Sequence, residues 1–313
     1  MNHTADSSTW PALPYSEWRE TLATLHLWLQ IVGKISLAQC DWVNHSWHVA
    51  MQVSARGLKT RLMPYGEKSF QLEFDFMDHR LRIEVSDGRA VSIALEPQST
   101  ATFYRKVMDA LRALGVPAQI RTMPNELPEP IPFDHDETHC SYDREYAHRY
   151  WHVLVQSARV FETFRACFIG KCSPVHFFWG SADLAVTRFS GRRAPQHPGG
   201  VPFLPDWVAR EAYSHEVSSA GFWAGNEQYP HAAFYSYAYP EPPGYASVSV
   251  APAAAKYDPA MREFLLRYDD VRTAADPDAA LLEFLQTTFD AAATRGGWDV
   301  DALIRPREPG PVR

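Results

Sequence analysis

The sequence lacks an excess of basic residues. Its 30 Lys and Arg are outnumbered by 37 Asp and Glu, which gives a formal net charge of −7. A protein that binds nucleic acid needs surplus cations to neutralise phosphates, so the charge balance argues against that class. We therefore expect no nucleic-acid partner.

Cysteines, export signals and membrane-length apolar runs are also scarce. The four cysteines have neither a disulfide framework nor a Cys-x-x-Cys spacing. The N-terminal segment MNHTADSSTW lacks the basic start and the apolar run of a secretory signal. Polar side chains interrupt the apolar stretches well short of a membrane span. These absences predict a cytoplasmic protein with reduced thiols and no membrane partner.

The chain has no glycine-rich nucleotide or flavin fingerprint. Gly33 and Gly170 each begin a Gly-Lys-x-Ser segment, but a phosphate loop needs a further glycine upstream and a helix that follows. Here each glycine is expected to end a helix, where the partial negative charge repels phosphate. The sequence therefore does not identify a cofactor, and a divalent metal is an alternative.

Aromatic and imidazole side chains, in contrast, are abundant, with 10 Trp, 14 Tyr, 17 Phe and 13 His. Aromatic rings bury large areas while their polar tips seek partners, and histidine titrates near neutrality and binds metals. This composition suits the lining of a pocket. A core built from large flat rings is the simpler alternative.

The first half predicts a helix, several antiparallel strands and a second helix. The first helix runs from about Ser16 to Gly33 and the second covers about 98–114. Between them, apolar side chains predict four strands: 47–55, 69–76, 80–85 and 90–95.

The second half repeats this order after a proline-rich and acidic segment, 121–138. A long helix is expected over about 141–169 and a final helix over about 277–294. Between them, apolar alternation predicts five strands: 174–179, 183–189, 213–218, 232–239 and 245–250.

Both halves also carry a hydrophobic-Gly-Lys-x-Ser pentapeptide, at 32–36 and 169–173, where the first helix of each half is expected to end. We predict an α+β fold of two similar halves, each an antiparallel β-sheet with flanking helices, that arose by internal duplication. The predicted parts are a first half, a linker, a second half and a disordered tail: 13–120, 121–138, 139–300 and 301–313. A pocket is expected at or near the join.

The segment SPVHFFWGSADLAVTRFSGR, 173–192, contains several side chains of the types that act in catalysis and ligand binding. In a strand, His176 shares a face with Phe178, whereas Trp179 lies on the other. Arg188 aligns with apolar neighbours, and a buried arginine needs a carboxylate or an anionic ligand. Glu216 is a candidate partner for Arg188, and Arg192 is expected at the mouth of the pocket.

His215 and Glu216 lie on opposite faces of a strand and do not form a dyad by themselves. The segment 234–242 places Tyr237 in a row of three tyrosines, which with Trp223 forms a platform for a flat ligand. On the first helix, His26 and Gln30 are one turn apart, either in the core or at the rim of a pocket.

A metal site is the alternative to an acid–base site without a cofactor. His148 and His152 have helical i,i+4 spacing, but Arg149 stands where a metalloprotease needs glutamate, so a solvated face is the better interpretation. The remaining candidate ligand set is His139, His176 and His215.

Five segments resemble a bacterial family that is catalogued only as a domain of unknown function: LHLWLQIVGK, NHSWH, VHFFWGSADLAVTRFSGR, YSHEVSSAGFWAG and FYSYAYPEP. The resemblance covers about 13–300 and implies a bacterial cytosolic protein. It implies no activity and assigns no catalytic residue.

We expect a protein with a small-molecule pocket, and an enzyme in preference to a binding protein. His176 or His215, with Glu216, would perform acid–base chemistry on an anionic or aromatic molecule, by hydrolysis or isomerisation. The expected ligand contacts are Arg188, Arg192, Trp179, Trp223, Tyr237, His26 and Gln30. The alternatives are a non-catalytic ligand-binding or scaffold protein and a metal-assisted hydrolase that uses a histidine cluster.

Overall fold

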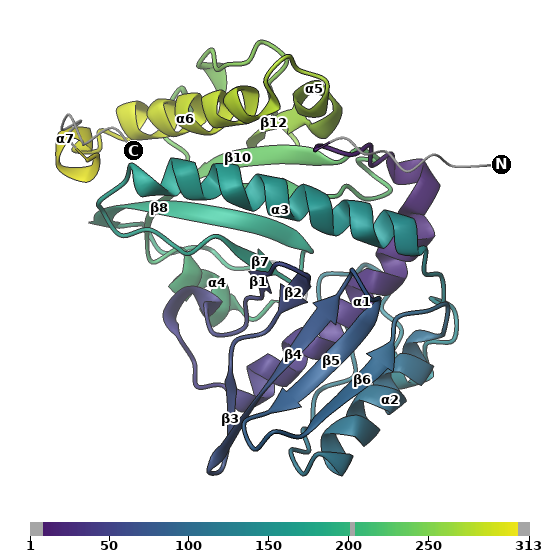
Figure 1. Ribbon diagram of the computed structural model, residues 1–313. Helices are drawn as coiled ribbons and strands as arrows, with labels where there is room; N and C mark the ends of the chain where they lie inside the picture. Colours follow the sequence, from purple (N-terminus) through teal and green to yellow (C-terminus); the bar gives the residue numbers. More distant parts are fainter. Residues whose placement is uncertain (1–8, 201–203, 306–313) are drawn as a thin grey trace, which may run out of the picture.

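Two antiparallel six-stranded sheets, one from each half of the chain, form the frame of the protein (Figure 1). The computed structural model describes residues 9–200 and 204–305. Within these residues seven α-helices pack around the sheets. The predicted α+β class, with an antiparallel sheet in each half, is confirmed.

The first sheet has the order β1-β2-β4-β5-β6, and β3 pairs with β4. Its strands are β1 (Gln52–Val53), β2 (Gly57–Lys59), β3 (Met63–Tyr65), β4 (Lys68–Asp75), β5 (Arg80–Val85) and β6 (Ala90–Ala94). The alternation of apolar and polar side chains determines the buried face of β4, because Phe70, Leu72 and Phe74 are fully buried while Gln71 and Glu73 between them are partly exposed. The predicted strand 47–55 is mostly wrong: residues Asn44–Ser46 form a 3₁₀ turn (η1), and only β1 follows.

The second sheet has the order β11-β12-β10-β9-β8-β7. Its strands are β7 (His176–Phe178), β8 (Asp183–Arg193), β9 (His215–Trp223), β10 (Ala233–Tyr239), β11 (Lys256–Asp258) and β12 (Glu263–Arg267). The predicted strand 245–250 is wrong, because Gly244 adopts a left-handed conformation and a 3₁₀ turn (η3, Tyr245–Ser247) follows it. The edge strand β11 and its neighbour β12 were not predicted.

Seven α-helices accompany the two sheets in the described residues. They are α1 (Tyr15–Gln39), α2 (Thr100–Ala113), α3 (Arg144–Ala166), α4 (Asp206–Ala212), α5 (Tyr268–Arg272), α6 (Pro277–Arg295) and α7 (Val300–Leu303). Helices α3 and α6 lie on the same side of the second sheet, and α1 and α2 pack together beside the first (Figure 1). Trp28 of α1 stacks on Phe103 of α2, with 4.4 Å between ring centroids, and Phe103 stacks on Phe74 of β4.

One continuous hydrophobic cluster contains buried residues of both halves, from α1 and both sheets to α6. Part of the predicted disordered tail is ordered, since α7 forms and Ile304 pairs with Phe168. Residues 306–313 of that predicted tail lie outside the described residues.

Helix α1 is long and apolar enough to pass for a membrane span by length and composition. Its apolar residues, however, are packed inside the protein: 78% of the most apolar window is buried. Within this fold α1 is therefore a core helix.

The two predicted helix-ending glycines occupy different places. Gly33 lies inside α1, which continues to Gln39, whereas Gly170 lies in the loop after α3. The Trp179 indole packs directly against Gly33, and a Cβ there would overlap the ring, so the position needs glycine although it lies inside a helix. The two pentapeptides are therefore not equivalent in the structure, and they give no support to an internal duplication.

This contact predicts the effect of Gly33→Ala. Alanine is normally better in a helix by about 1 kcal/mol, but here its methyl group displaces the buried indole, at a cost of about 1–3 kcal/mol. We expect a net loss in the free energy of unfolding, measured by urea titration. The double variant Gly33→Ala/Trp179→Phe has a smaller ring and is expected to recover part of the loss; a stability gain in Gly33→Ala alone would contradict the contact.

Candidate functional site

A cavity of about 800 Å³ lies where the two halves meet. The first half contributes the end of α1, the η1 segment and residues 121–126. The second half contributes one face of β7 to β10, the turn 179–181 and α4. The walls of this cavity therefore come from segments far apart in the sequence.

Strand alternation decides which side chains of the second sheet reach the cavity. On β8, Asp183, Ala185, Thr187 and Phe189 line it, whereas the intervening side chains face α3 and α6. On β10 the same rule directs Tyr235 and Tyr237 toward the cavity. Six further aromatic side chains line the cavity: Trp42, Trp47, Phe178, Trp179, Trp207 and Tyr213.

A carboxyl group, Asp183, lies at one end of the cavity and is held by two hydroxyl groups. Ser181 donates to Oδ1 and Tyr235 donates to Oδ2. The residue is only 7% exposed, and burial raises the pKa of its carboxyl above the ordinary value, while the two hydroxyl donors oppose this rise. The hydroxyl groups therefore fix the orientation of Asp183.

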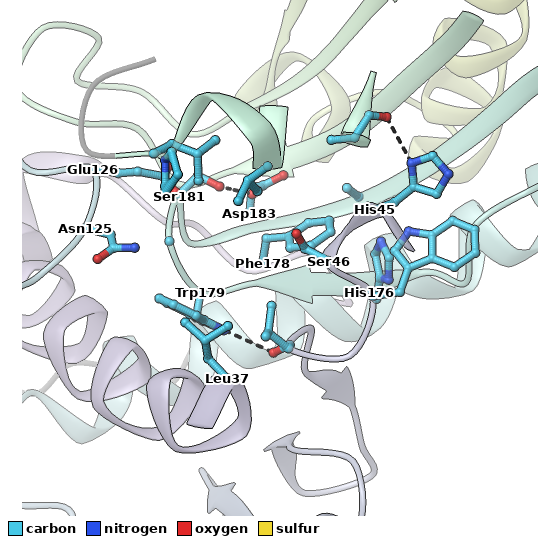
Figure 2. A pocket seen from close by; sticks show the side chains of 18 of the residues that line it. Leu37, His45, Ser46, Asn125, Glu126, His176, Phe178, Trp179, Ser181 and Asp183 are labelled. Carbon is cyan, nitrogen blue, oxygen red and sulfur yellow. Dashed lines mark hydrogen bonds between the residues drawn. The ribbon is translucent and has the colours of Figure 1, made fainter. Parts of the chain in front are cut away.

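Glu126 lies beside Asp183 and Ser181 at the same end (Figure 2). Burial, with a smaller contribution from the Asp183 charge, raises the pKa of Glu126 to about 7. The side chain is exposed to the open cavity, and within the described residues its carboxyl forms no hydrogen bond or ion pair. The Gly180 backbone lies against this carboxyl, since a Cβ on Gly180 would overlap Oε1.

Strained backbone is concentrated around the cavity. Six non-glycine residues in the described part of the chain have positive φ. Three of them, His45, Ser46 and Glu126, line the cavity, and Ala182 lies between two lining residues. Such conformations cost of order 1–3 kcal/mol each and are enriched at active sites and ligand-binding sites.

His176 lines the cavity at the end opposite Glu126 (Figure 2). It is 3% exposed, and its ring nitrogens make no hydrogen bond with any residue that the structure describes. Burial, with a smaller contribution from the Arg165 charge, lowers the pKa of the imidazole to about 4. His176 is therefore neutral at physiological pH and can donate and accept one hydrogen bond.

His45 has a different role. Its Nδ1 lies 3.0 Å from the Ala212 carbonyl, and its Nε2 lies 2.7 Å from the Lys171 amine. Both ring nitrogens are thus engaged by the protein: Nδ1–H donates to the carbonyl and Nε2 accepts from the ammonium. This histidine fixes the η1 segment to the C-terminal end of α4.

His26 and Gln30, predicted as ligand contacts, lie behind the wall of the cavity. The Gln30 amide accepts from the Asn125 N–H at 2.8 Å and donates to the Asn125 carbonyl at 2.9 Å. His26 Nε2 lies 2.8 Å from the Gly180 carbonyl. These two residues position the loops that carry Glu126 and Ser181.

Of the other predicted residues, Trp179 and Tyr237 line the cavity with His176. Trp179 was expected on the opposite face from His176, but β7 ends at Phe178 and the following turn directs the indole to the cavity. Trp223 stacks on Tyr229 instead and does not line it.

The predicted pairing of Arg188 with Glu216 is wrong, because Glu216 forms an ion pair with Arg192 at 2.7 Å. Arg192 also donates to the carbonyls of Gly296 and Gly297, beyond α6, and lies outside the cavity. His215 is half-buried near Ser214, and neither His215 nor Glu216 lines the cavity.

Arg188 faces α3 and α6 with Leu184 and Val186, on the face that the sequence predicted. It is fully buried, and its guanidinium lies 3.4 Å, 5.0 Å and 4.3 Å from the ring centroids of Phe164, Phe168 and Phe289. One nitrogen donates to the Phe164 carbonyl, while Nε and Nη1 have no hydrogen-bond partner in the described structure. Arg188 is therefore a packed core residue, separated from the cavity by the sheet.

The predicted metal ligands do not gather. His139 pairs with Asp136 at 2.8 Å in the segment before α3, away from His176 and His215. Within residues 9–200 and 204–305, no group of three His, Cys, Asp or Glu side chains has the geometry of a metal site.

Two carboxyl groups of the site were missed. Glu126 lies in a segment that we interpreted as a linker. The hydrogen bond from Asn125 of this segment to Gln30 of α1 holds it at the cavity. Asp183 could have been found, because it shares a strand face with Ala185 and Phe189, and an acid on such a face is buried.

These features define a two-sheet α+β protein with a large aromatic cavity at the junction of its halves. A family model described as a family of unknown function (DUF5996) matches residues 10–305, and the chain belongs to this family. The expected membership in a family of unknown function is thereby confirmed. Neither a curated protein nor a solved structure matches the chain.

The position of Arg188 predicts a contrast between two variants. Arg188→Ala leaves a cavity among three phenylalanine rings and is expected to lower the free energy of unfolding by about 2–4 kcal/mol. Arg188→Met keeps most of the volume and removes a buried charge, so we expect little loss or a gain of about 1 kcal/mol. Urea titration of both variants measures this difference, and equal losses would contradict a purely structural role.

The raised pKa of Glu126 predicts a pH-dependent stability. The folded protein binds the proton of the Glu126 carboxyl more tightly than the unfolded chain does. The contribution of Glu126 to the free energy of unfolding is therefore fully present below about pH 4.5. It decreases as the pH rises toward 7. We expect Glu126→Gln to reduce the loss of unfolding free energy between pH 5 and pH 7.5. The matched control is Glu129→Gln, a carboxyl of the same segment that does not line the cavity, and an equal effect of both variants would contradict the assignment.

Proposed function

We propose that the protein is an enzyme whose cavity binds a small molecule and whose Glu126 carboxyl exchanges a proton with it. The volume supports a small-molecule ligand, since ligand pockets usually measure roughly 300–1,000 Å³. The walls combine many aromatic rings with a few polar groups, which is the usual composition of such pockets.

The observation that carries the proposal is the pair of unlike carboxyl groups at one end of the cavity. Asp183 is held by Ser181 and Tyr235, whereas Glu126 has no protein partner and has a pKa of about 7. A proton donor and acceptor works best when its pKa is near the working pH. Carboxyl groups with contrasting environments are typical of acid–base sites, where each group has its own role.

In this proposal Glu126 gives or takes a proton at the reacting atom of the ligand. Asp183 and its two hydroxyl donors hold the negative charge beside it and keep the pKa of Glu126 raised. His176, expected to be an acid–base residue, becomes a neutral contact that hydrogen-bonds to the ligand, since its pKa is about 4. The rings of Phe178, Trp179 and other wall residues pack against a flat ligand.

This arrangement supports a hydrolysis or an isomerisation, because proton transfer alone serves either reaction. We further propose a bacterial protein with a cytoplasmic location. All four cysteines are free thiols, which is the usual state of thiols in that compartment.

A comparison of metabolite conversion tests the proposal. Wild-type protein, Glu126→Gln and Glu129→Gln are each incubated with a bacterial small-molecule extract, and compounds consumed or formed are measured by mass spectrometry. We expect at least one compound to be converted by the wild type and by Glu129→Gln, and conversion by Glu126→Gln to fall by about 10²-fold or more.

Two results would overturn this proposal. Conversion by Glu126→Gln at the wild-type rate would remove Glu126 from the reaction. A compound that binds the wild type and is recovered unchanged, with no other compound converted, would favour the non-catalytic ligand-binding protein.

A further inference from the structure

A second feature of the cavity is a pair of cations that have no acidic partner. Lys34, near the end of α1, and Arg121, in the segment after α2, both line the cavity. Within the described residues neither side chain forms an ion pair with a carboxylate. The two charges are close enough for Arg121 to lower the pKa of the Lys34 amine, although burial is the larger cause.

Lys34 is unusual among the charged residues because it is only 6% exposed. Its Nζ donates to the Asn125 side-chain oxygen at 2.7 Å and lies 6.0 Å from the centre of the Trp179 ring. An ammonium group has three N–H donors, so two remain without an acceptor in the described structure. Both contacts of the amine are with residues that line the cavity.

Other buried charged side chains that the structure describes have polar partners or are enclosed by aromatic rings. Asp75 has arginine partners and Asp136 has His139. Arg188, the other buried Lys or Arg among residues 9–200 and 204–305, is enclosed by phenylalanine rings away from the cavity. Lys34 is thus the buried cation that a molecule in the cavity can reach.

We propose that the ligand of this cavity carries a carboxylate or another small anionic group, which binds between Lys34 and Arg121. This inference rests on the cavity being the ligand site of the proposed function, but it does not depend on catalysis. A buried ammonium is stabilised by a charged acceptor, and hydrogen bonds to charged groups are stronger than neutral ones. The anionic or aromatic ligand expected from the sequence is retained, with Lys34 and Arg121 in the place of Arg188 and Arg192.

Three matched aromatic probes test the charge preference. The probes are 2-naphthoate, 2-naphthamide and 2-naphthylmethylammonium, which share a flat ring and differ in charge. Dissociation constants are measured by isothermal titration calorimetry, with the quenching of tryptophan fluorescence as a second readout. We expect the wild type to bind 2-naphthoate at least tenfold more tightly than either other probe.

Substitutions locate the anion contact. We expect Lys34→Met to weaken 2-naphthoate binding by at least tenfold and to change 2-naphthamide binding less than twofold. Lys34→Arg keeps the charge and is expected to retain most of the preference for 2-naphthoate over the neutral and cationic probes. Arg121 is exposed, so Arg121→Met is expected to fold and to weaken 2-naphthoate binding by about threefold; it carries the test if Lys34→Met does not fold.

Three results would overturn the inference: no binding of 2-naphthoate, equal or tighter binding of the neutral or cationic probe, or unchanged 2-naphthoate binding in both Lys34→Met and Arg121→Met. The failure of the proposed enzyme gives a different pattern. In that case 2-naphthoate binds in the expected manner while Glu126→Gln converts metabolites as fast as the wild type.

Discussion

The packing of Trp179 against α1 is the contact on which the cavity depends. The indole lies directly on the Cα of Gly33, and its Nε1 donates to the Val49 carbonyl at 3.0 Å. One side chain of the second half therefore holds both the first helix and the segment after η1. Because Trp179 is only 5% exposed, this junction is part of the hydrophobic core, and the space beside it becomes a stable cavity instead of a flexible gap.

The second sheet separates two very different environments. On one face, Arg188 is packed among phenylalanine rings and helices, and its charge has no acidic partner in the described residues. On the other face, Asp183 and the tyrosines of β10 border the cavity with Glu126, Lys34 and His176. Charged groups near an open space can be solvated or can bind a ligand, whereas a charge in a filled layer can only be a structural cost. The proposed function for that reason uses the cavity face of the sheet.

Local patterns predicted the regular elements well. The strands around Phe70 and Leu72, the strand of Arg188 and the helices α2 and α6 follow from side-chain periodicity alone. The prediction failed where a distant residue overrides a local signal. Gly33 looks like a helix end, but α1 continues to Gln39, and the glycine instead leaves room for the indole of Trp179, a residue far along the chain.

The candidate site also combines residues that local patterns predicted with residues that only distant contacts bring together. His176, Trp179 and Tyr237 were recognised because aromatic and imidazole side chains are conspicuous in a strand. The sequence by itself determined the fold class and which strand positions share a face, since both depend on nearest neighbours along the chain. Only the tertiary structure decided that Glu126, Lys34 and Asp183 border one cavity. They come from three distant segments, and their meeting depends on how α1, the segment 121–126 and the second sheet pack together.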